Sequence, residues 1–269
     1  MLKQRIQTAL WLIPLALCGF FVLQGGAFTA FVALVMLLGG WEWARLVGLV
    51  NQHERVAYGL ALVVGFWLLQ AIIPVWLVLF VALAWWLQAG RMVLNYPVCV
   101  VDWGGIRRQL LMGALILLPA GVALIWLKDQ ERANLLILTV MLMVWAADIG
   151  AYFAGRALGK RKLAPAVSPG KSREGVYGGL VASGLLALCC GLVLGLSGGK
   201  LLVFLVAAQV IVVFSVLGDL TESMFKRNAG IKDSSNLLPG HGGVLDRIDS
   251  LTAALPLFAL FFYLTGWAS

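Results

Sequence analysis

Apolar segments of about 20 residues, separated by short polar links, follow one another along nearly the whole of this chain. An α-helix needs about that many apolar residues to cross the hydrocarbon core of a bilayer, where its backbone polar groups must be paired internally. Charged residues make up 12% of the chain, whereas soluble domains contain about 25%. We therefore expect an all-α fold, that of a polytopic integral membrane protein, with no room for a separate soluble domain of ordinary size.

The apolar segments predict nine transmembrane helices, which are residues 6–23, 27–44, 58–73, 75–88, 109–127, 133–151, 176–196, 201–218 and 250–267. The third and fourth segments are short and meet at Pro74. They could therefore form either a hairpin of two spans or one shallow re-entrant pair. Lys3 and Arg5 precede the first segment as in a signal peptide, but spans continue throughout the chain, so we expect this helix to be retained.

Lysine and arginine are distributed unevenly between the two sides on which the links alternate. If the N-terminus is cytoplasmic, 17 of the 20 Lys and Arg residues fall on cytoplasmic segments and three fall outside. Such an excess is typical of cytoplasmic links. We therefore predict a cytoplasmic N-terminus, an external C-terminus and a location in the inner (cytoplasmic) membrane, whichever form residues 58–88 take. The net charge of +8 then reflects topology and contact with lipid or nucleotide phosphate, with no role for nucleic acid.

Functional residues are expected in the second half of the chain. Residues 1–132 form about five spans without a usable motif, whereas residues 133–269 contain two long polar loops, 155–175 and 219–249. The predicted topology places both loops in the cytoplasm. It also places four carboxylates at cytoplasmic helix ends: Asp148, Asp219, Asp246 and Asp249. At these ends they can face water, which avoids a cost of about 2.5–3.5 kcal/mol at mid-membrane depth.

Carboxylates on both flanks of the 219–249 loop share helix faces. Asp246 and Asp249 are three residues apart, and Asp219, Glu222 and Lys226 are spaced at i, i+3 and i+7. Oxygen ligands of this kind suit Mg²⁺, which also keeps waters and binds substrate phosphates. The alternative is a set of neutralising ion pairs, such as Glu222 with Lys226. We favour the ion pair for Glu222 and the metal role for Asp219 and Asp246.

The run Pro239-Gly240-His241-Gly242-Gly243 allows backbone N–H groups to turn toward an anion, as in glycine-rich phosphate loops. Such a run by itself is more often a plain turn. Here it is flanked by four cations, which are Lys226, Arg227, Lys232 and Arg247. We therefore interpret it as a phosphate cradle. His241 could bind phosphate, transfer a proton or only brace the loop.

The loop at 155–175 has a similar composition. Asp148 and Tyr152 lie near one helical face and lead into a basic segment, followed by Ser168-Pro169-Gly170-Lys171-Ser172. This is not a P-loop, since the spacing differs and we expect no strand before it. The alternative is a basic cytoplasmic link in which Ser172 caps the next helix, which we prefer for Arg161 and Arg173. For Ser168, Lys171 and Ser172 we favour contact with phosphate or nucleotide.

Residues 223–249 resemble the signature of the phosphatidate cytidylyltransferases, also called CDP-diacylglycerol synthases. The residues in register are Ser223, Lys226-Arg227, Lys232-Asp233, Pro239, His241-Gly242-Gly243, Asp246-Arg247 and Asp249. Residues 148–175 resemble the second conserved region of that family, D-I-x-A-Y-x-x-G-R followed by S-P-x-K-S-x-E-G. The two regions cover about a fifth of the chain, and its length and span number are similar to those of the bacterial members.

This resemblance implies an Mg²⁺-dependent transfer of the cytidylyl group from CTP to phosphatidate, giving CDP-diacylglycerol and pyrophosphate. It implies metal binding by Asp219 and Asp246, with Asp249 and Asp148 as further ligands and a second metal ion left open. The implied phosphate-binding residues are Lys226, Arg227, Lys232, His241 and Arg247. The implied nucleotide-binding residues are Ser168, Lys171, Ser172, Gly242 and Gly243. The partners are CTP, phosphatidate, membrane lipid and a second copy of the chain in a homodimer.

Two other functions remain to be distinguished. A CTP-dependent lipid kinase of the dolichol-kinase type would transfer the γ-phosphoryl group of CTP and release CDP. An ion-coupled transporter would place charges at mid-span and break helices in paired halves, whereas the charges here gather on one side and no internal repeat is present. The first alternative is therefore the stronger one.

Overall fold

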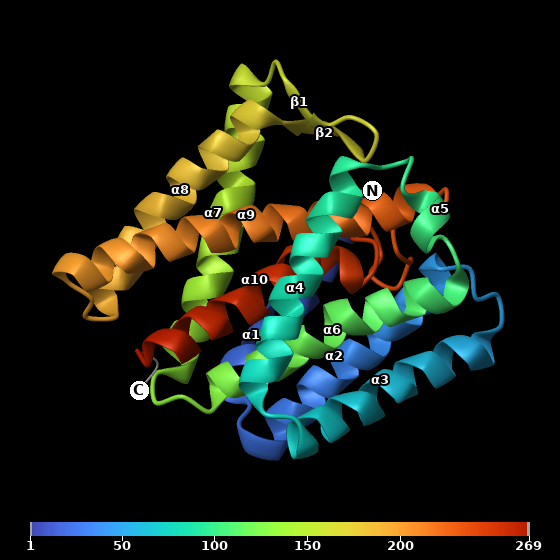
Figure 1. Cartoon of the computed structure of the whole chain (residues 1–269), viewed down its shortest axis with the longest axis horizontal. Helices are drawn as coiled ribbons and strands as arrows, with labels where there is room; N and C mark the ends of the chain where they lie inside the picture. The colour runs from blue at the N-terminus through green and yellow to red at the C-terminus, as the bar shows by residue number, and fades with distance from the viewer. Residues whose placement is uncertain (1, 268–269) are drawn as a thin grey trace.

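The computed structural model of the chain describes residues 2–267 and is almost entirely helical (Figure 1). In its first half the helices are α1 (Leu2–Leu17), which continues into a π-helical turn η1 (Cys18–Val22), α2 (Gly25–Leu46), α3 (Gln52–Ile72), α4 (Val75–Leu94), α5 (Val100–Trp103) and α6 (Ile106–Lys128). In its second half the elements are α7 (Ala133–Leu158), β1 (Lys162–Ala164), β2 (Ser168–Ser172), α8 (Arg173–Val193), α9 (Gly198–Asn228) and α10 (Leu245–Thr265).

Eight helices in the part of the chain that the structure describes are long and apolar enough to cross a membrane. They are α2, α3, α4, α6, α7, α8, α9 and α10. The first predicted span corresponds to a shorter apolar helix, Leu10–Val22, which joins the end of α1 to η1. The predicted all-α polytopic fold is therefore confirmed, with eight full-length helices and one shorter one among the described residues, where nine spans were predicted.

The chain breaks cleanly at Pro74. Helix α3 ends at Ile72 and α4 begins at Val75, with Pro74 as the residue that precedes its first turn. Proline suits this place because its missing N–H would have no partner within the helix. The two helices have 21 and 20 residues, and they share one neighbour, α6; α3 also packs on α2, whereas α4 packs on α9 and α10. This arrangement favours two spans over a shallow re-entrant pair.

A short antiparallel hairpin interrupts the helical pattern between α7 and α8. Strands β1 and β2 pair with Lys162 opposite Ser172 and Ala164 opposite Ser168. The expectation that no strand precedes the Ser168–Ser172 segment was therefore wrong. The pairing turns the chain back sharply, so that Gly155 at the end of α7 and Gly175 at the start of α8 lie against each other.

The links fall on two opposite sides of the molecule. Figure 1 shows the α2–α3 link, α5, the β-hairpin and the α9–α10 loop at the upper and right edges, with the other links and the C-terminus at the lower left. The segments that we predicted to be cytoplasmic therefore share one side. Which side faces the cytoplasm stays a prediction.

Helix α10 occupies the centre of the bundle. It packs against α9, α6 and α4, and its middle is lined by buried side chains, among them Phe258 and Phe262. The 219–249 loop begins on α9 and ends on α10, and the 155–175 loop begins on α7 and ends on α8. This packing decides how the two polar loops meet.

Candidate active site

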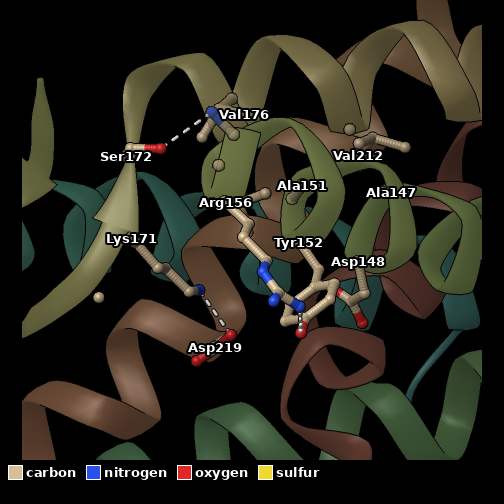
Figure 2. A pocket seen from close by; sticks show the side chains of 15 residues that line it. Ala147, Asp148, Ala151, Tyr152, Arg156, Lys171, Ser172, Val176, Val212 and Asp219 are labelled. Atoms are coloured by element: carbon tan, nitrogen blue, oxygen red, sulfur yellow. Dashed lines mark hydrogen bonds and ion pairs between the residues drawn. The ribbon is translucent and has the colours of Figure 1, made fainter. Parts of the chain in front are cut away.

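A pocket of about 480 Å³ opens between α7, α8, α9 and strand β2 (Figure 2). Its polar lining comes from three elements: Asp148, Tyr152 and Arg156 on α7, Lys171 and Ser172 at the end of β2, and Asp219 on α9. Most of the remaining lining residues are glycine, alanine or valine. A small-residue lining leaves space for a ligand beside these polar groups.

An ion pair joins the two polar loops inside this pocket. Lys171 Nζ lies 2.5 Å from Asp219 Oδ2, and both side chains are a little over one-quarter exposed. Ser223 Oγ donates to the other oxygen of Asp219 over 3.2 Å. Figure 2 shows Lys171 and Asp219 pointing toward one another, with Asp148 and the hydrogen-bonded pair of Arg156 and Tyr152 beside them. Two segments far apart in the sequence thus form one site.

Asp219 lies near two other carboxylates. Its charge interacts with those of Asp148, which lines the pocket, and Asp249, which lies in the second turn of α10. Lys171 is the cation paired with Asp219, and Arg156 also lines the pocket, so carboxylates and cations face the same space. Within residues 2–267, no three His, Cys, Asp or Glu side chains are arranged to hold a metal ion by themselves. Magnesium usually takes one or two carboxylates together with waters and substrate phosphates, so the residues present fit an ion that binds with a nucleotide.

Ser172 performs the capping role that was the alternative in the sequence. Its side chain is buried, and its Oγ accepts a hydrogen bond of 3.1 Å from the N–H of Gly175 at the start of α8. It also lines the pocket, whereas Ser168, at the far end of β2, does not. Glu174 accepts from the backbone N–H groups of Lys160 and Arg161 and so holds the loop against α8. Of the hydroxyls predicted here, only that of Ser172 reaches the pocket.

Lys226 and Asp246 belong to a second, buried network, which lies about two turns beyond Asp219 along α9. Lys226 Nζ lies 2.7 Å from Asp246 Oδ1 and 3.0 Å from Glu222 Oε1. The other oxygen of Asp246 accepts from the N–H and the hydroxyl of Ser234 and from the N–H of Gly243, at 2.7–2.9 Å. The ion pair expected for Glu222 is present, and Asp246 already has four donors around it.

One N–H group of the glycine-rich run 239–243, and the two N–H groups that follow the run, donate to carboxylates of the protein itself. Gly243 N–H donates to Asp246, whereas the N–H groups of Val244 and Leu245 donate to Glu42. Gly242 has φ +80, where a side chain would be strained and would also collide with Asp246. The His241 N–H donates to the carbonyl oxygen of Leu238, so the phosphate cradle stays a prediction.

The other predicted phosphate-binding residues lie outside the pocket. Arg227 Nε donates to Val167 O over 3.2 Å and so ties α9 to the β-hairpin. Lys232 and Arg247 are exposed, and His241 is partly buried, with a buried Nδ1 that no hydrogen bond reaches. The predicted site therefore divides in two, with Asp249 at the junction, since its charge interacts with both Asp219 and Lys226.

Glu42 and Arg45 on α2 were missed from the sequence. Glu42 is fully buried and accepts hydrogen bonds from the 234–245 segment, and Arg45 donates to Ser234 O. The available signal was a carboxylate inside an otherwise apolar segment, residues 27–44, where an ionisable residue is costly unless it is paired and is therefore usually functional.

Comparison with known proteins gives one family over nearly the whole chain. A model of the cytidylyltransferase family matches residues 3–265. The chain is 58% identical to phosphatidate cytidylyltransferase of Pseudomonas aeruginosa, with 100% of each chain covered. It is 43% identical to the protein of the same name from Haemophilus influenzae, with 98% of this chain and 99% of that protein covered. The Bacillus subtilis protein of that name is 47% identical over 123 residues, 44% of this chain.

Proposed function

The chain belongs to the cytidylyltransferase family, and we propose that it transfers the cytidylyl group of CTP to phosphatidate, forming CDP-diacylglycerol and pyrophosphate. This is a step of phospholipid biosynthesis carried out in a membrane. The observation that supports the site is the ion pair of Lys171 and Asp219, because it brings the two motif-bearing loops to one pocket.

The reaction needs positioning and charge neutralisation more than a strong base. A phosphate oxygen of phosphatidate attacks the α-phosphorus of CTP, a new P–O bond forms there, and the bond to the β-phosphate oxygen breaks to release pyrophosphate. The attacking oxygen is already anionic, so no proton has to be removed from it. Lys171 and Arg156 supply positive charge at the pocket for the triphosphate, and Tyr152 presents an aromatic ring beside them.

Magnesium is the proposed cofactor, and it would neutralise charge on the triphosphate and on the leaving pyrophosphate. Asp219, Asp148 and Asp249 are the residues that we propose to hold it, since Asp219 and Asp148 line the same pocket and the Asp249 backbone packs against Gly218, next to Asp219. Asp246 was also predicted as a ligand. Because its oxygens already accept from Lys226, Ser234 and Gly243, we propose that it shapes the site instead.

Phosphatidate would approach from the α9–α10 loop, beyond the end of α9. Lys232 and Arg247 are exposed cations at the ends of the α9–α10 loop, and they suit the phosphate headgroup of a lipid. Lys226, Arg227 and His241 support this loop. We further propose that the loop faces the cytoplasm from the inner membrane, as the excess of basic residues on its side indicates, and that two copies form a homodimer.

Labelled CTP tests this function directly. Detergent-purified protein is incubated with Mg²⁺, phosphatidate and CTP labelled at the α-phosphorus, and lipid products are separated from nucleotides. We expect label in CDP-diacylglycerol and equimolar pyrophosphate. A lipid kinase would leave the α-label in CDP and move label into lipid only from γ-labelled CTP. Absence of labelled lipid from both nucleotides would contradict either enzyme.

A further inference from the structure

Glu42 is a buried carboxylate in the first half of the chain, and it accepts hydrogen bonds from the second half, at the start of α10. It lies near the end of α2 and is 0% exposed. Removing a carboxylate from water costs several kcal/mol unless hydrogen bonds replace the water. Glu42 has such bonds: Oε1 accepts from Ser235 Oγ at 2.6 Å and Val244 N at 2.9 Å, and Oε2 accepts from Leu245 N at 2.7 Å.

These donors belong to the start of α10. The first N–H groups of a helix have no partner within it, and a negative charge there is stabilising. Leu245 is the first residue of α10, and Val244 precedes it. Arg45, one turn beyond Glu42, donates to Ser234 O over 3.1 Å. Helix α2 thus binds both the entry of α10 and the loop that leads to it.

Ser234 connects Glu42 to the buried network around Lys226. Its hydroxyl lies 2.8 Å from Asp246 Oδ2 and 3.2 Å from Glu42 Oε2. A hydroxyl carries one hydrogen, so the closer oxygen, that of Asp246, receives it. Gly243 is packed between the same groups, since a side chain there would collide with Ser234 and Glu42. Glu42, Ser234 and Asp246 therefore determine where α10 starts.

We infer that Glu42, with Arg45, is a positioning residue for cytidylyl transfer. By fixing the start of α10, it sets the depth and rotation of Asp249, which lies one turn further on and whose backbone packs against Gly218, the residue before Asp219. Glu42 does not line that pocket, so it acts through α10. This inference rests on the proposed function, and it gives the N-terminal half a direct part in the activity.

Glu42→Gln tests the inference, because the amide keeps the shape of the side chain but presents an NH₂ group to backbone donors. We expect kcat to fall by about 10²-fold, the effect of displacing a reacting group by roughly 1 Å, with the KM for CTP changed less than about threefold. Tryptic cleavage after the exposed Lys232 should accelerate, because the loop loses its anchor. Glu42→Asp keeps the charge, so its kcat should be about tenfold higher than that of Glu42→Gln.

Glu54→Gln is the matched control, since Glu54 is an exposed carboxylate on α3, and it should behave as wild type. If Glu42→Gln does not fold, Arg45→Gln replaces it and should lower kcat by about tenfold, with KM for CTP kept. Wild-type kcat in these variants, or a parallel loss of kcat and CTP affinity in Glu42→Gln and Glu42→Asp, would overturn the inference. Failure of the wild-type protein to make CDP-diacylglycerol would instead overturn the proposed function.

Discussion

At the scale of single residues, Asp219 and Asp246 have the same side chain and opposite surroundings. The Asp219 side chain is 28% exposed and pairs with Lys171 in an open pocket. The Asp246 side chain is 7% exposed and is surrounded by donors from Lys226, Ser234 and Gly243. A carboxylate with free lone pairs can receive a metal ion, whereas a saturated one must first lose the bonds that hold the loop. Their variants should therefore fail in different ways.

Asp219→Asn is expected to remove activity without removing stability. The rate of CDP-diacylglycerol formation should fall by about 10³-fold, and the Mg²⁺ concentration for half-maximal activity should rise, because the charge that we propose to hold the ion is lost. The melting temperature in detergent should stay within about 2 °C, since a partly exposed ion pair contributes little. Chelation of Mg²⁺ in the wild type should reproduce the loss. Normal turnover by Asp219→Asn at low Mg²⁺ would remove Asp219 from the metal site.

Asp246→Asn is expected to lower stability as well as activity. The amide leaves Lys226 with a weakened partner and turns an NH₂ group toward backbone donors in a buried place. Breaking a buried pair in this way costs roughly 3 kcal/mol, so the free energy of unfolding should fall by about that amount. Chemical denaturation of the purified variant measures it. A variant as stable as wild type, with a raised Mg²⁺ requirement, would instead support direct metal binding by Asp246.

At the scale of elements, the length of α9 and the small residues between α7 and α8 determine where the pocket and its carboxylates lie. Helix α9 has 31 residues, hence a length of about 46 Å, which exceeds a hydrocarbon core of about 30 Å. Its last turns, with Asp219 and Lys226, can therefore stand clear of lipid. Helices α7 and α8 approach closely through glycine and alanine, and a side chain at Gly178 would collide with Ala154 and with the backbone at Gly150. The pocket opens beside this contact.

Gly178→Ala tests whether the close approach of α7 and α8 shapes the pocket. An added methyl group must push the helices apart, so the free energy of unfolding should fall by about 1–3 kcal/mol and the KM for CTP should rise. Gly199→Ala is the matched control, because nothing lies within 4 Å of a Cβ added there. It should be neutral or slightly stabilising. If the two variants had the same free energy of unfolding and the same KM for CTP, the close approach of α7 and α8 at Gly178 would not shape the pocket.

At the scale of the whole molecule, the two halves are interleaved. The N-terminal helix α2 holds the entry of the C-terminal helix α10, and α4 packs on α9 and α10. The α2–α3 link, the β-hairpin and the α9–α10 loop lie on one side of the molecule (Figure 1), and residues of the hairpin line the pocket. A division at residue 132 therefore separates motif-bearing from motif-free sequence and does not separate two structural units.

A single cysteine at Pro74 tests the arrangement in the membrane. In a variant without the native cysteines, Pro74→Cys should react with a membrane-impermeant maleimide added to the outside of cells, because α3 and α4 are each long enough to span. Cysteine at Lys200 should also react, and cysteine at Lys232 should react only after the membrane is opened. Labelling of the cysteine at position 200 without labelling of the cysteine at position 74 would instead support a re-entrant pair for α3 and α4.

The order of residues was enough to predict the helical membrane fold, the approximate span boundaries and the polar residues that gather on one side. These follow from the length of apolar segments and the position of charges, which are local properties of the chain. Only the tertiary structure decided that Lys171 pairs with Asp219, that Lys226 and Asp246 are buried together, and that Glu42 anchors α10. Such pairings depend on how helices distant in sequence rotate and pack, and the spacing of residues along one helix does not contain that information.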